Sequence, residues 1–245
     1  MTDDKRMPFT GHFKELRQRF VRSLIALAVA AAIAFIFYNQ IFEILKGPAP
    51  DDVKFIAIEL MENLTTVFKV CLTAGLVIAM PYLVYQLFAF LSPALTSKEK
   101  KFVFTSIPFV AGLFIAGVLF AYFIALPPAI GFLTGFADQV AEVEVRISNY
   151  VDIATRLLVA VGLSFEMPLI IMVLARVGIT SPSWLAKQRK IWVIIAFVLG
   201  AIITPTFDPI NQTIIALPLI VLYELSIWLS KLVYRKKKEP AATGG

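Results

Sequence analysis

The sequence predicts an all-α membrane protein with six transmembrane helices and both ends of the chain in the cytoplasm, the last two helices being unusually short. Three observations predict this fold class. Apolar residues make up 59% of the 245 residues and charged residues only 16%, well below the roughly 25% typical of soluble domains. Several windows hold the roughly 20 apolar residues that cross a bilayer. Basic residues are concentrated in alternate loops, as expected for loops in the cytoplasm.

Four apolar segments have the length of ordinary spans. We expect them at about 20–45, 64–91, 102–126 and 150–176. Asn63 is expected to cap the second span, and Pro127-Pro128 to end the third. After the fourth, Thr180-Ser181-Pro182 has the pattern of a helix start, with a hydroxyl cap and proline at the first helical position.

The last two predicted spans, at about 191–203 and 213–229, are shorter. The thirteen residues from Ile191 to Ile203 extend only about 20 Å as a helix, whereas the hydrocarbon core is about 30 Å thick. One interpretation is a re-entrant pair, and the other is a helical hairpin that thins the bilayer locally. We favour two short crossings joined by a turn at 205–209.

The distribution of basic residues sets the orientation. Of the 23 Lys and Arg residues, all but five fall on one side of the predicted spans. The five exceptions are Lys46, Lys54, Lys69, Arg146 and Arg156. The positive-inside rule places the richer side in the cytoplasm. We therefore divide the chain into a cytoplasmic amphipathic N-terminal segment (1–19), a six-helix transmembrane domain (20–230) and a basic cytoplasmic tail (231–245).

Several function classes lack support in the sequence. Cys71 is the only cysteine and there is one histidine, so we expect no metal site and no cofactor. We find no convincing nucleophile–base pair, so we do not expect an enzyme, and we expect no nucleic-acid partner. The chain has no nucleotide-binding motif, so we expect energy to come from the transmembrane ion gradient. No internal repeat is visible, although repeats are common in secondary transporters.

Carboxylates inside predicted spans are the first candidate site residues, because charge is costly in hydrocarbon. Glu166 lies near the middle of the fourth span, two residues before Pro168. We interpret it as a polar docking point for another helix or a transported chain. An internal, hydrogen-bonded carboxylic acid is the structural alternative, and the proton site of a proton-coupled small-solute transporter is the functional one.

Three further polar residues lie at the ends of the last two spans. Glu224 is near the cytoplasmic end of the sixth, where it either snorkels to the interface or contributes to function. Asp208 and Gln212 border the outer end of the hairpin. Turn and cap chemistry is enough to explain Asp208-Pro209; the functional alternative is that Asp208 and Gln212 serve partner contact or transport within the membrane, as we expect for Glu166.

Two glutamates stand out on the basic cytoplasmic face, since Glu15 and Glu99 each lie close to the start of a membrane helix. A carboxylate held there can bind the guanidinium of a partner arginine. Each also has a structural explanation. Thr96-Ser97-Lys98-Glu99 fits a capping box, and Glu15 can pair with Arg19 one turn on.

The order of motifs along residues 8 to 232 resembles that of the TatC family, the polytopic subunit of the twin-arginine protein translocase. The matching positions are His12-Phe13-Lys14-Glu15-Leu16-Arg17-Gln18-Arg19, Pro48, Phe88-Ala89-Phe90-Leu91-Ser92-Pro93-Ala94-Leu95, Glu99, Ala121-Tyr122-Phe123, Ser164-Phe165-Glu166-Met167-Pro168, Gly178-Ile179-Thr180-Ser181-Pro182, Thr204-Pro205, Asp208, Gln212 and Leu222-Tyr223-Glu224. Each motif alone is weak, and together they are specific.

The resemblance implies a receptor for folded precursors that carry twin-arginine signal peptides, in the inner membrane of a prokaryote. It implies that Glu15 and Glu99 bind the arginine pair, with Arg17 nearby, and that Glu166 meets a polar group of a single-span TatA- or TatB-type subunit. It also implies a homo-oligomer within the complex. Pro48, Phe90 and Tyr122 match further family positions, and we expect a structural or supporting role for them and for Glu224.

Overall fold

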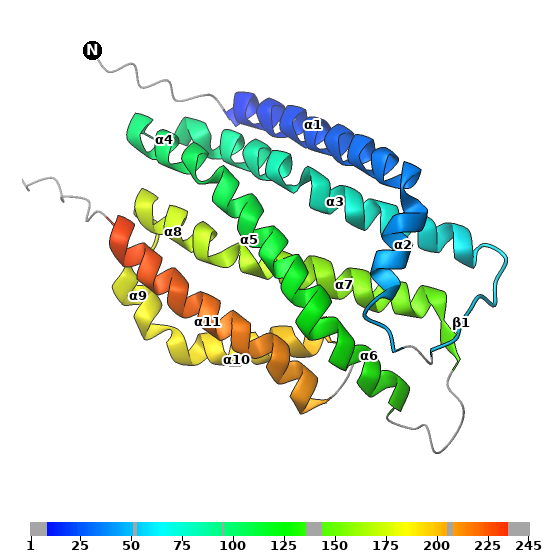
Figure 1. Cartoon of the computed structure of the whole chain (residues 1–245). Coiled ribbons are helices and arrows are strands. Elements are labelled where there is room, and N and C mark those ends of the chain that lie inside the picture. The colour runs from blue at the N-terminus through cyan, green and yellow to red at the C-terminus, as the bar shows by residue number, and fades with distance from the viewer. Residues whose placement is uncertain (1–8, 51–52, 95, 136–143, 205–207, 235–245) are drawn as a thin grey trace, which may run out of the picture. The chain divides into compact units, whose positions relative to one another are not determined.

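The computed structural model describes residues 9–50, 53–94, 96–135, 144–204 and 208–234, and these residues are mostly helical (Figure 1). They fall into two compact units whose boundary lies inside one helix, between Gly112 and Leu113. Unit 1 comprises residues 1–47 and 57–112, and unit 2 comprises residues 48–56 and 113–245. The prediction of an all-α fold is confirmed.

Unit 1 is built around two long helices. Its elements are α1 (Phe9–Ile36), α2 (Tyr38–Lys46), α3 (Glu62–Leu91), the 3-10 turn η1 (Ser92–Ala94), α4 (Ser97–Thr105) and the first part of α5 (Ile107–Phe120). Helices α1 and α3 pack along each other (Figure 1). A Cβ atom at Gly75 on α3 would lie only 2.7 Å from the backbone nitrogen of Ala31 on α1. Glycine at this crossing therefore allows the two backbones to approach.

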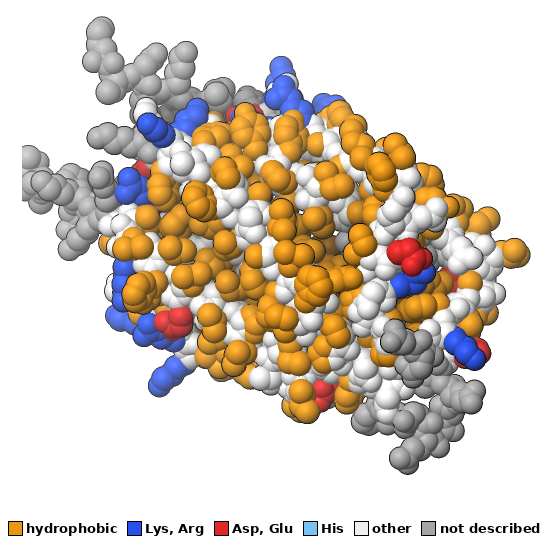
Figure 2. All heavy atoms as spheres, in the orientation of Figure 1, with side chains coloured by type: hydrophobic (Ala, Val, Ile, Leu, Met, Phe, Trp, Pro, Cys, Tyr) orange, Lys and Arg blue, Asp and Glu red, His pale blue; other side chains and the backbone are white. Residues whose placement is uncertain are grey.

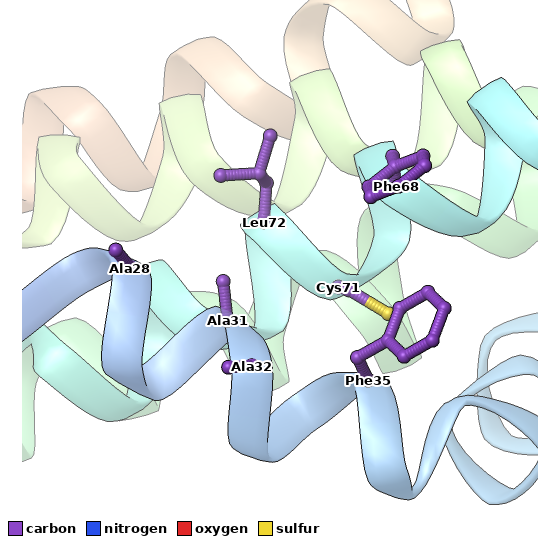
Figure 3. Close-up of a pocket in the computed structure, with 7 residues that line it drawn as sticks. All are labelled: Ala28, Ala31, Ala32, Phe35, Phe68, Cys71 and Leu72. Carbon is purple, nitrogen blue, oxygen red and sulfur yellow. The ribbon is translucent and has the colours of Figure 1, made fainter.

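An open apolar groove of about 480 Å³ lies between α1 and α3 (Figure 3). Its lining consists of Ala28, Ala31, Ala32 and Phe35 from α1 and Phe68, Cys71 and Leu72 from α3. The rings of Phe35 and Phe68 lie 5.8 Å apart. Cys71 is buried and free, so it acts as a small packing residue.

Two predicted boundaries in unit 1 are wrong. The first span is not one helix, because Phe37, at φ −107° and ψ 22°, separates α1 from α2. The apolar run continues across this break, so hydropathy gives no sign of it. Asn63 is not a cap, since α3 begins one residue earlier, at Glu62. The buried Glu62 carboxylate accepts the backbone N–H groups of Ile58 and Glu59 instead.

Unit 2 holds the remaining helices and one short sheet. Its elements are β1 (Phe55–Ile56), the rest of α5, the π-helical turn η2 (Ala121–Ala125), α6 (Leu126–Gly135), β2 (Val145–Arg146), α7 (Ile147–Phe165), α8 (Met167–Val177), α9 (Pro182–Lys187), α10 (Arg189–Ile203) and α11 (Pro209–Val233). Strands β1 and β2 pair in parallel, with Phe55 opposite Val145. The Phe55 ring also packs edge-on against Tyr150, at 5.0 Å between centroids.

The predicted stop at Pro127-Pro128 is wrong, because the helix continues through both prolines to Gly135. A widened π turn precedes them, in which the N–H of Leu126 donates to the carbonyl of Ala121, five residues back. Proline disrupts a helix because it lacks an N–H and its ring clashes with the carbonyl four residues earlier. The π turn changes the geometry of the carbonyl groups that precede Pro127, and the helix continues past the proline ring.

The last two helices differ in length, so the prediction of two short spans is half wrong. Helix α10 has 15 residues, about 22 Å, and is short. Helix α11 has 25 residues, about 37 Å, because Asp208 and Pro209 start it before the apolar run and Ser230 to Val233 extend it. The predicted turn at 205–209 lies largely outside the described residues.

Five helical segments of the described chain are long and apolar enough to cross a membrane: 13–36, 62–91, 99–135, 147–177 and 209–233. Helix α10 is shorter than these. Hydrophobic side chains cover most of the face shown in Figure 2, and the exposed ones include Phe20 and Ile25 on α1. Such a surface suits lipid, so the chain is a multi-pass membrane protein.

Candidate functional site

The first candidate carboxylate, Glu15, lies on α1 and forms an ion pair with Arg19. The Nε and Nη2 atoms of Arg19 both donate to one oxygen of Glu15, Oε1, at 2.9 and 2.6 Å. The residues are four apart, so they occupy the same face of the helix. The pairing considered from the sequence is therefore present.

Helix α3 extends this pair into a network. Arg19 Nη1 donates to Oε1 of Gln86 at 3.3 Å, and Gln86 Nε2 donates to the hydroxyl oxygen of Tyr82 at 2.6 Å. Gln86 is buried in an otherwise apolar part of α3. A buried carboxamide needs partners, and it finds them on both sides. Four side chains from two helices thus form one connected polar cluster.

The second oxygen of Glu15 is the incomplete part of the cluster. Oε2 is buried and has no hydrogen-bond partner among the described residues. An acceptor left in this state costs about 1–3 kcal/mol. Glu15 can therefore accept a further N–H donor, and the arrangement favours such a donor energetically.

The second candidate, Glu99, forms the predicted capping box at the start of α4. Its Oε2 accepts the backbone N–H of Thr96 at 2.8 Å, and its own N–H donates to the Thr96 hydroxyl at 3.5 Å. This geometry fixes the side chain at the helix terminus. A carboxylate has about four lone-pair sites, and the bond to Thr96 uses one of them.

Helix α3 also supports the helix that carries Glu99. The ring of Tyr85 on α3 packs edge-on against Phe104 on α4, with centroids 5.6 Å apart, and Tyr82 stacks on Tyr85 at 6.2 Å. Both candidate carboxylates therefore lie on helices that contact α3. The beginning of α1 and α4 lie at the same end of unit 1 (Figure 1).

Exposed cationic side chains surround these carboxylates in the sequence. Arg17 is exposed on α1, as is Lys14, and Lys100 and Lys101 are exposed on α4. A basic face of this kind repels stray cationic segments. A ligand with positive charge therefore gains only where it reaches the carboxylates themselves.

The third candidate, Glu166, occupies the break between α7 and α8. It is 3% exposed, and neither carboxyl oxygen has a hydrogen-bond partner among the described residues. Helix α5 crosses α7 closely beside it, since a Cβ at Gly117 would lie 2.8 Å from the Phe165 ring. A buried carboxyl group without partners is costly, so packing holds Glu166 in an unsatisfied position.

Comparison with known proteins identifies the family. A family model described as Sec-independent protein translocase protein (TatC) matches residues 11–218. The chain belongs to the TatC family. This is a family of protein translocase components and not of enzymes.

Individual relatives agree over nearly the whole chain. The Sec-independent protein translocase protein TatC of Aquifex aeolicus (strain VF5) is 43% identical over 241 residues, which cover 95% of this chain and 98% of the relative. The corresponding protein of Desulforapulum autotrophicum is 37% identical, with 97% and 88% covered. A crystal structure of the twin-arginine translocase receptor TatC is 41% identical, has a TM-score of 0.79, and covers 91% of this chain and 100% of its own.

Asp208 and Gln212, near the connection between α10 and α11, have structural partners. Both oxygens of Asp208 accept backbone N–H groups, from Ile210 at 3.2 Å and Asn211 at 2.9 Å, so Asp208 caps α11. The Gln212 side chain donates to the carbonyl of Phe197 on α10 at 2.8 Å. Both residues therefore shape the α10–α11 hairpin.

Glu224 makes the fork-shaped ion pair that the sequence did not reveal. Arg189 Nε and Nη2 donate to its two oxygens at 2.6 and 2.9 Å, joining the start of α10 to α11. Both side chains are about half exposed. Next to this pair, Trp192 stacks on Tyr223 with centroids 4.8 Å apart. Glu224 therefore supports the helix pair, and snorkelling alone does not account for it.

The remaining family positions are dispersed. Pro48 is half-buried in the turn after α2, and Phe90 is half-buried near the end of α3. Tyr122 lies in the π turn and packs edge-on against Phe123, with centroids 4.7 Å apart. Glu166, Asp208 and Gln212 belong to unit 2, whereas Glu15 and Glu99 belong to unit 1.

Sequence reasoning missed Gln86 and Tyr82 as partners of the Glu15 pair. The available signal was a polar Tyr-x-x-x-Gln spacing in an apolar helix, where a carboxamide requires a partner. It did not say that the partner lay on α1. Among the described residues, no group of three His, Cys, Asp or Glu could hold a metal ion.

Proposed function

We propose that this chain is the receptor and scaffold subunit of a twin-arginine translocation system. In this role it binds the twin-arginine signal peptides of folded precursors at the cytoplasmic face of a prokaryotic inner membrane. The observation that carries the proposal is the Glu15 carboxylate, which has one buried oxygen without a partner among the described residues and lies on the same helix as the exposed Lys14 and Arg17. Membership of the TatC family and the likeness to a structure of a twin-arginine translocase receptor support it.

The proposed topology has six spans with both termini in the cytoplasm. The five long apolar segments supply five of them, and α10 is the sixth despite its length. An even number of crossings puts both ends on one side, which agrees with the concentration of basic residues in alternate loops. A helix of 15 residues then requires local thinning of the bilayer.

Arginine recognition follows from the chemistry of the two carboxylates. A guanidinium forms planar, charge-assisted hydrogen bonds to a carboxylate, and a lysine ammonium lacks this fork geometry. Two consecutive arginines can engage Glu15 and Glu99 together, with Arg17 at the margin of the site. The lysines and arginines nearby disfavour segments with isolated positive charge.

Partner assembly is assigned to unit 2. We propose that Glu166 meets a polar group on a single-span TatA- or TatB-type subunit, because a hydrogen bond from such a group would satisfy its buried oxygens. Asp208 and Gln212 support this surface by fixing the α10–α11 hairpin. Further copies of this chain complete the complex, and the transmembrane ion gradient supplies the energy.

Photocrosslinking to a synthetic twin-arginine signal peptide tests the receptor role. A photoreactive phenylalanine analogue replaces the exposed Phe13, two residues before Glu15. We expect Glu15→Gln and Glu99→Gln each to reduce the crosslinked product by about tenfold, the factor that 1.4 kcal/mol of lost interaction gives. Glu43→Gln is the matched control, since Glu43 is an exposed glutamate in the same unit that pairs with Lys46.

The folded state of each variant is checked by size-exclusion chromatography in detergent. Undiminished crosslinking in both glutamate variants would refute the assignment of this site. Proton-driven solute uptake by the purified chain in vesicles, lost on Glu166→Gln, would favour the alternative of a small-solute transporter.

A further inference from the structure

An arginine already occupies the site at Glu15, and it belongs to the chain itself. The Arg19 guanidinium uses three of its N–H groups there, two on Glu15 Oε1 and one on Gln86 Oε1. The contacts show which acceptors at this place a guanidinium can reach at once. They are a carboxylate from α1 and a carboxamide oxygen from α3.

The internal arginine fits the site imperfectly. In a fork-shaped pair, two parallel N–H groups meet the two oxygens of a carboxylate, as Arg189 does with Glu224. Arg19 instead places Nε and Nη2 on a single oxygen, and Oε2 is buried with no partner in the described part of the chain. An arginine that is not attached four residues away on the same helix is free to align with both oxygens.

We propose that Arg19 is a tethered internal occupant of the guanidinium site, and that a guest arginine displaces it and takes over Glu15 together with Gln86. This deepens the proposed function and rests on it. Oε2 is buried, so a guest reaches it only when a neighbouring side chain moves. Arg19 is the side chain bonded to the neighbouring oxygen Oε1, so its departure frees that oxygen and removes one of the groups packed beside Glu15.

Gln86 is the second acceptor of this site, and Tyr82 is a positioning residue. The Gln86 carboxamide could rotate to present either its oxygen or its nitrogen. Its bond to the Tyr82 hydroxyl uses the Nε2 group, which leaves Oε1 directed at the guanidinium of Arg19. A carbonyl oxygen accepts from a guanidinium and repels another acceptor, so this orientation selects for a donor with several N–H groups.

A tethered competitor weakens binding of a free ligand, because the ligand must first displace it. A pair four residues apart on a helix is weak when exposed, but here partial burial and the bond to Gln86 strengthen it. Removing Arg19 should therefore tighten guest binding by roughly three- to tenfold. If Arg19 instead only positions Glu15, its removal weakens binding, so the two roles predict opposite signs.

The test is a fluorescence-anisotropy titration of the full chain in lipid nanodiscs, with a labelled twin-arginine peptide and a matched twin-lysine peptide. The variants are Arg19→Gln, Gln86→Leu and Tyr82→Phe. Arg22→Gln is the control, because it removes one exposed positive charge from the same helix without touching the cluster. It corrects for the weaker repulsion of a cationic peptide.

We expect Arg19→Gln to bind the twin-arginine peptide roughly three- to tenfold more tightly than Arg22→Gln does. Gln86→Leu should bind the twin-arginine peptide at least threefold more weakly than the unaltered chain does, and its affinity for the twin-lysine peptide should fall less. The affinity of Tyr82→Phe for the twin-arginine peptide should lie between those of Gln86→Leu and the unaltered chain. Equal affinity of Arg19→Gln and Arg22→Gln, or a loss in Arg19→Gln, overturns the proposal. Arg19→Met is the second variant, and it decides the sign should Arg19→Gln not fold.

Failure of this inference is distinguishable from failure of the proposed function. If the unaltered chain does not prefer twin arginine to twin lysine, the receptor role itself fails. If the preference is present and depends on Glu15, but Arg19→Gln brings no gain, only the role of Arg19 as an internal occupant is refuted.

Discussion

At the scale of single residues, hydrogen bonding separates the acidic side chains that the sequence singled out. Asp208 and Glu224 have both carboxylate oxygens bonded. Glu15 keeps one oxygen without a partner and Glu166 keeps two, within the part of the chain that the structure describes. Unsatisfied buried acceptors are costly, so a hydrogen-bond donor that binds to Glu15 or Glu166 would stabilise the protein.

The capping role of Asp208 gives a prediction about stability. Asp208→Ala removes the acceptor for two N–H groups at the start of α11 and should lower the free energy of unfolding by about 1–2 kcal/mol. Thermal unfolding in detergent micelles measures the change. Asp208→Asn is the control, since asparagine caps helices nearly as well. Equal losses in both variants would show that charge, and not capping, is what matters there.

The sequence identified the local partners of these residues and missed the distant ones. The capping box at Glu99 and the Glu15–Arg19 pair follow from spacings of three and four residues, which helix geometry alone determines. The bonds from Arg19 to Gln86 and from Arg189 to Glu224 join residues 67 and 35 positions apart. Such contacts depend on how helices pack, which residue spacing does not encode.

At the scale of helices, most of the spans were predictable and most of their interruptions were not. Phe37 breaks a helix inside an apolar run, and Pro127-Pro128 fails to break one. The break at Glu166 does have a signal in the sequence, because Pro168 follows two residues later and loosens the helix there. Hydropathy measures transfer into lipid and is insensitive to backbone dihedral angles. The start of α9 was predicted correctly, since Ser181 accepts the N–H of Trp184 and Pro182 is the first helical residue.

The close crossing of α1 and α3 gives a prediction at this scale. Gly75→Ala places a Cβ 2.7 Å from the backbone of Ala31, so the helices must separate, and the free energy of unfolding should fall by about 1–3 kcal/mol. Gly112→Ala is the matched control, because no atom lies within 4 Å of its Cβ. That change should be neutral or stabilise by up to about 1 kcal/mol.

The measurement is thermal unfolding of both variants in the same detergent. A Gly75→Ala protein as stable as Gly112→Ala would contradict the close approach of the two backbones.

At the scale of the whole molecule, the distribution of charge along the chain is enough to predict the orientation. The excess of lysine and arginine in alternate loops needs no knowledge of packing, because it reflects only the cost of translocating positive charge. The division into two units was not predictable, since its boundary falls within the continuous helix α5.

The proposed orientation is testable by labelling intact cells with a membrane-impermeant maleimide. In a Cys71→Ala background, which removes the only native cysteine, we expect Lys54→Cys to react from outside and Lys190→Cys to react only after the cells are opened. Both native side chains are exposed. Labelling of Lys190→Cys in intact cells would contradict cytoplasmic placement of the loop before α10.

The π turn at Ala121–Ala125 makes the length of this helix as consequential as its composition. One extra residue in a single turn rotates everything that follows by about 100° about the helix axis. Leu126, Ala129 and Ile130, which follow the turn, are buried with that rotation in place. Loss of a single residue there would leave the apolar character of the helix intact, yet it would turn these three side chains away from their core and present a different stripe to it.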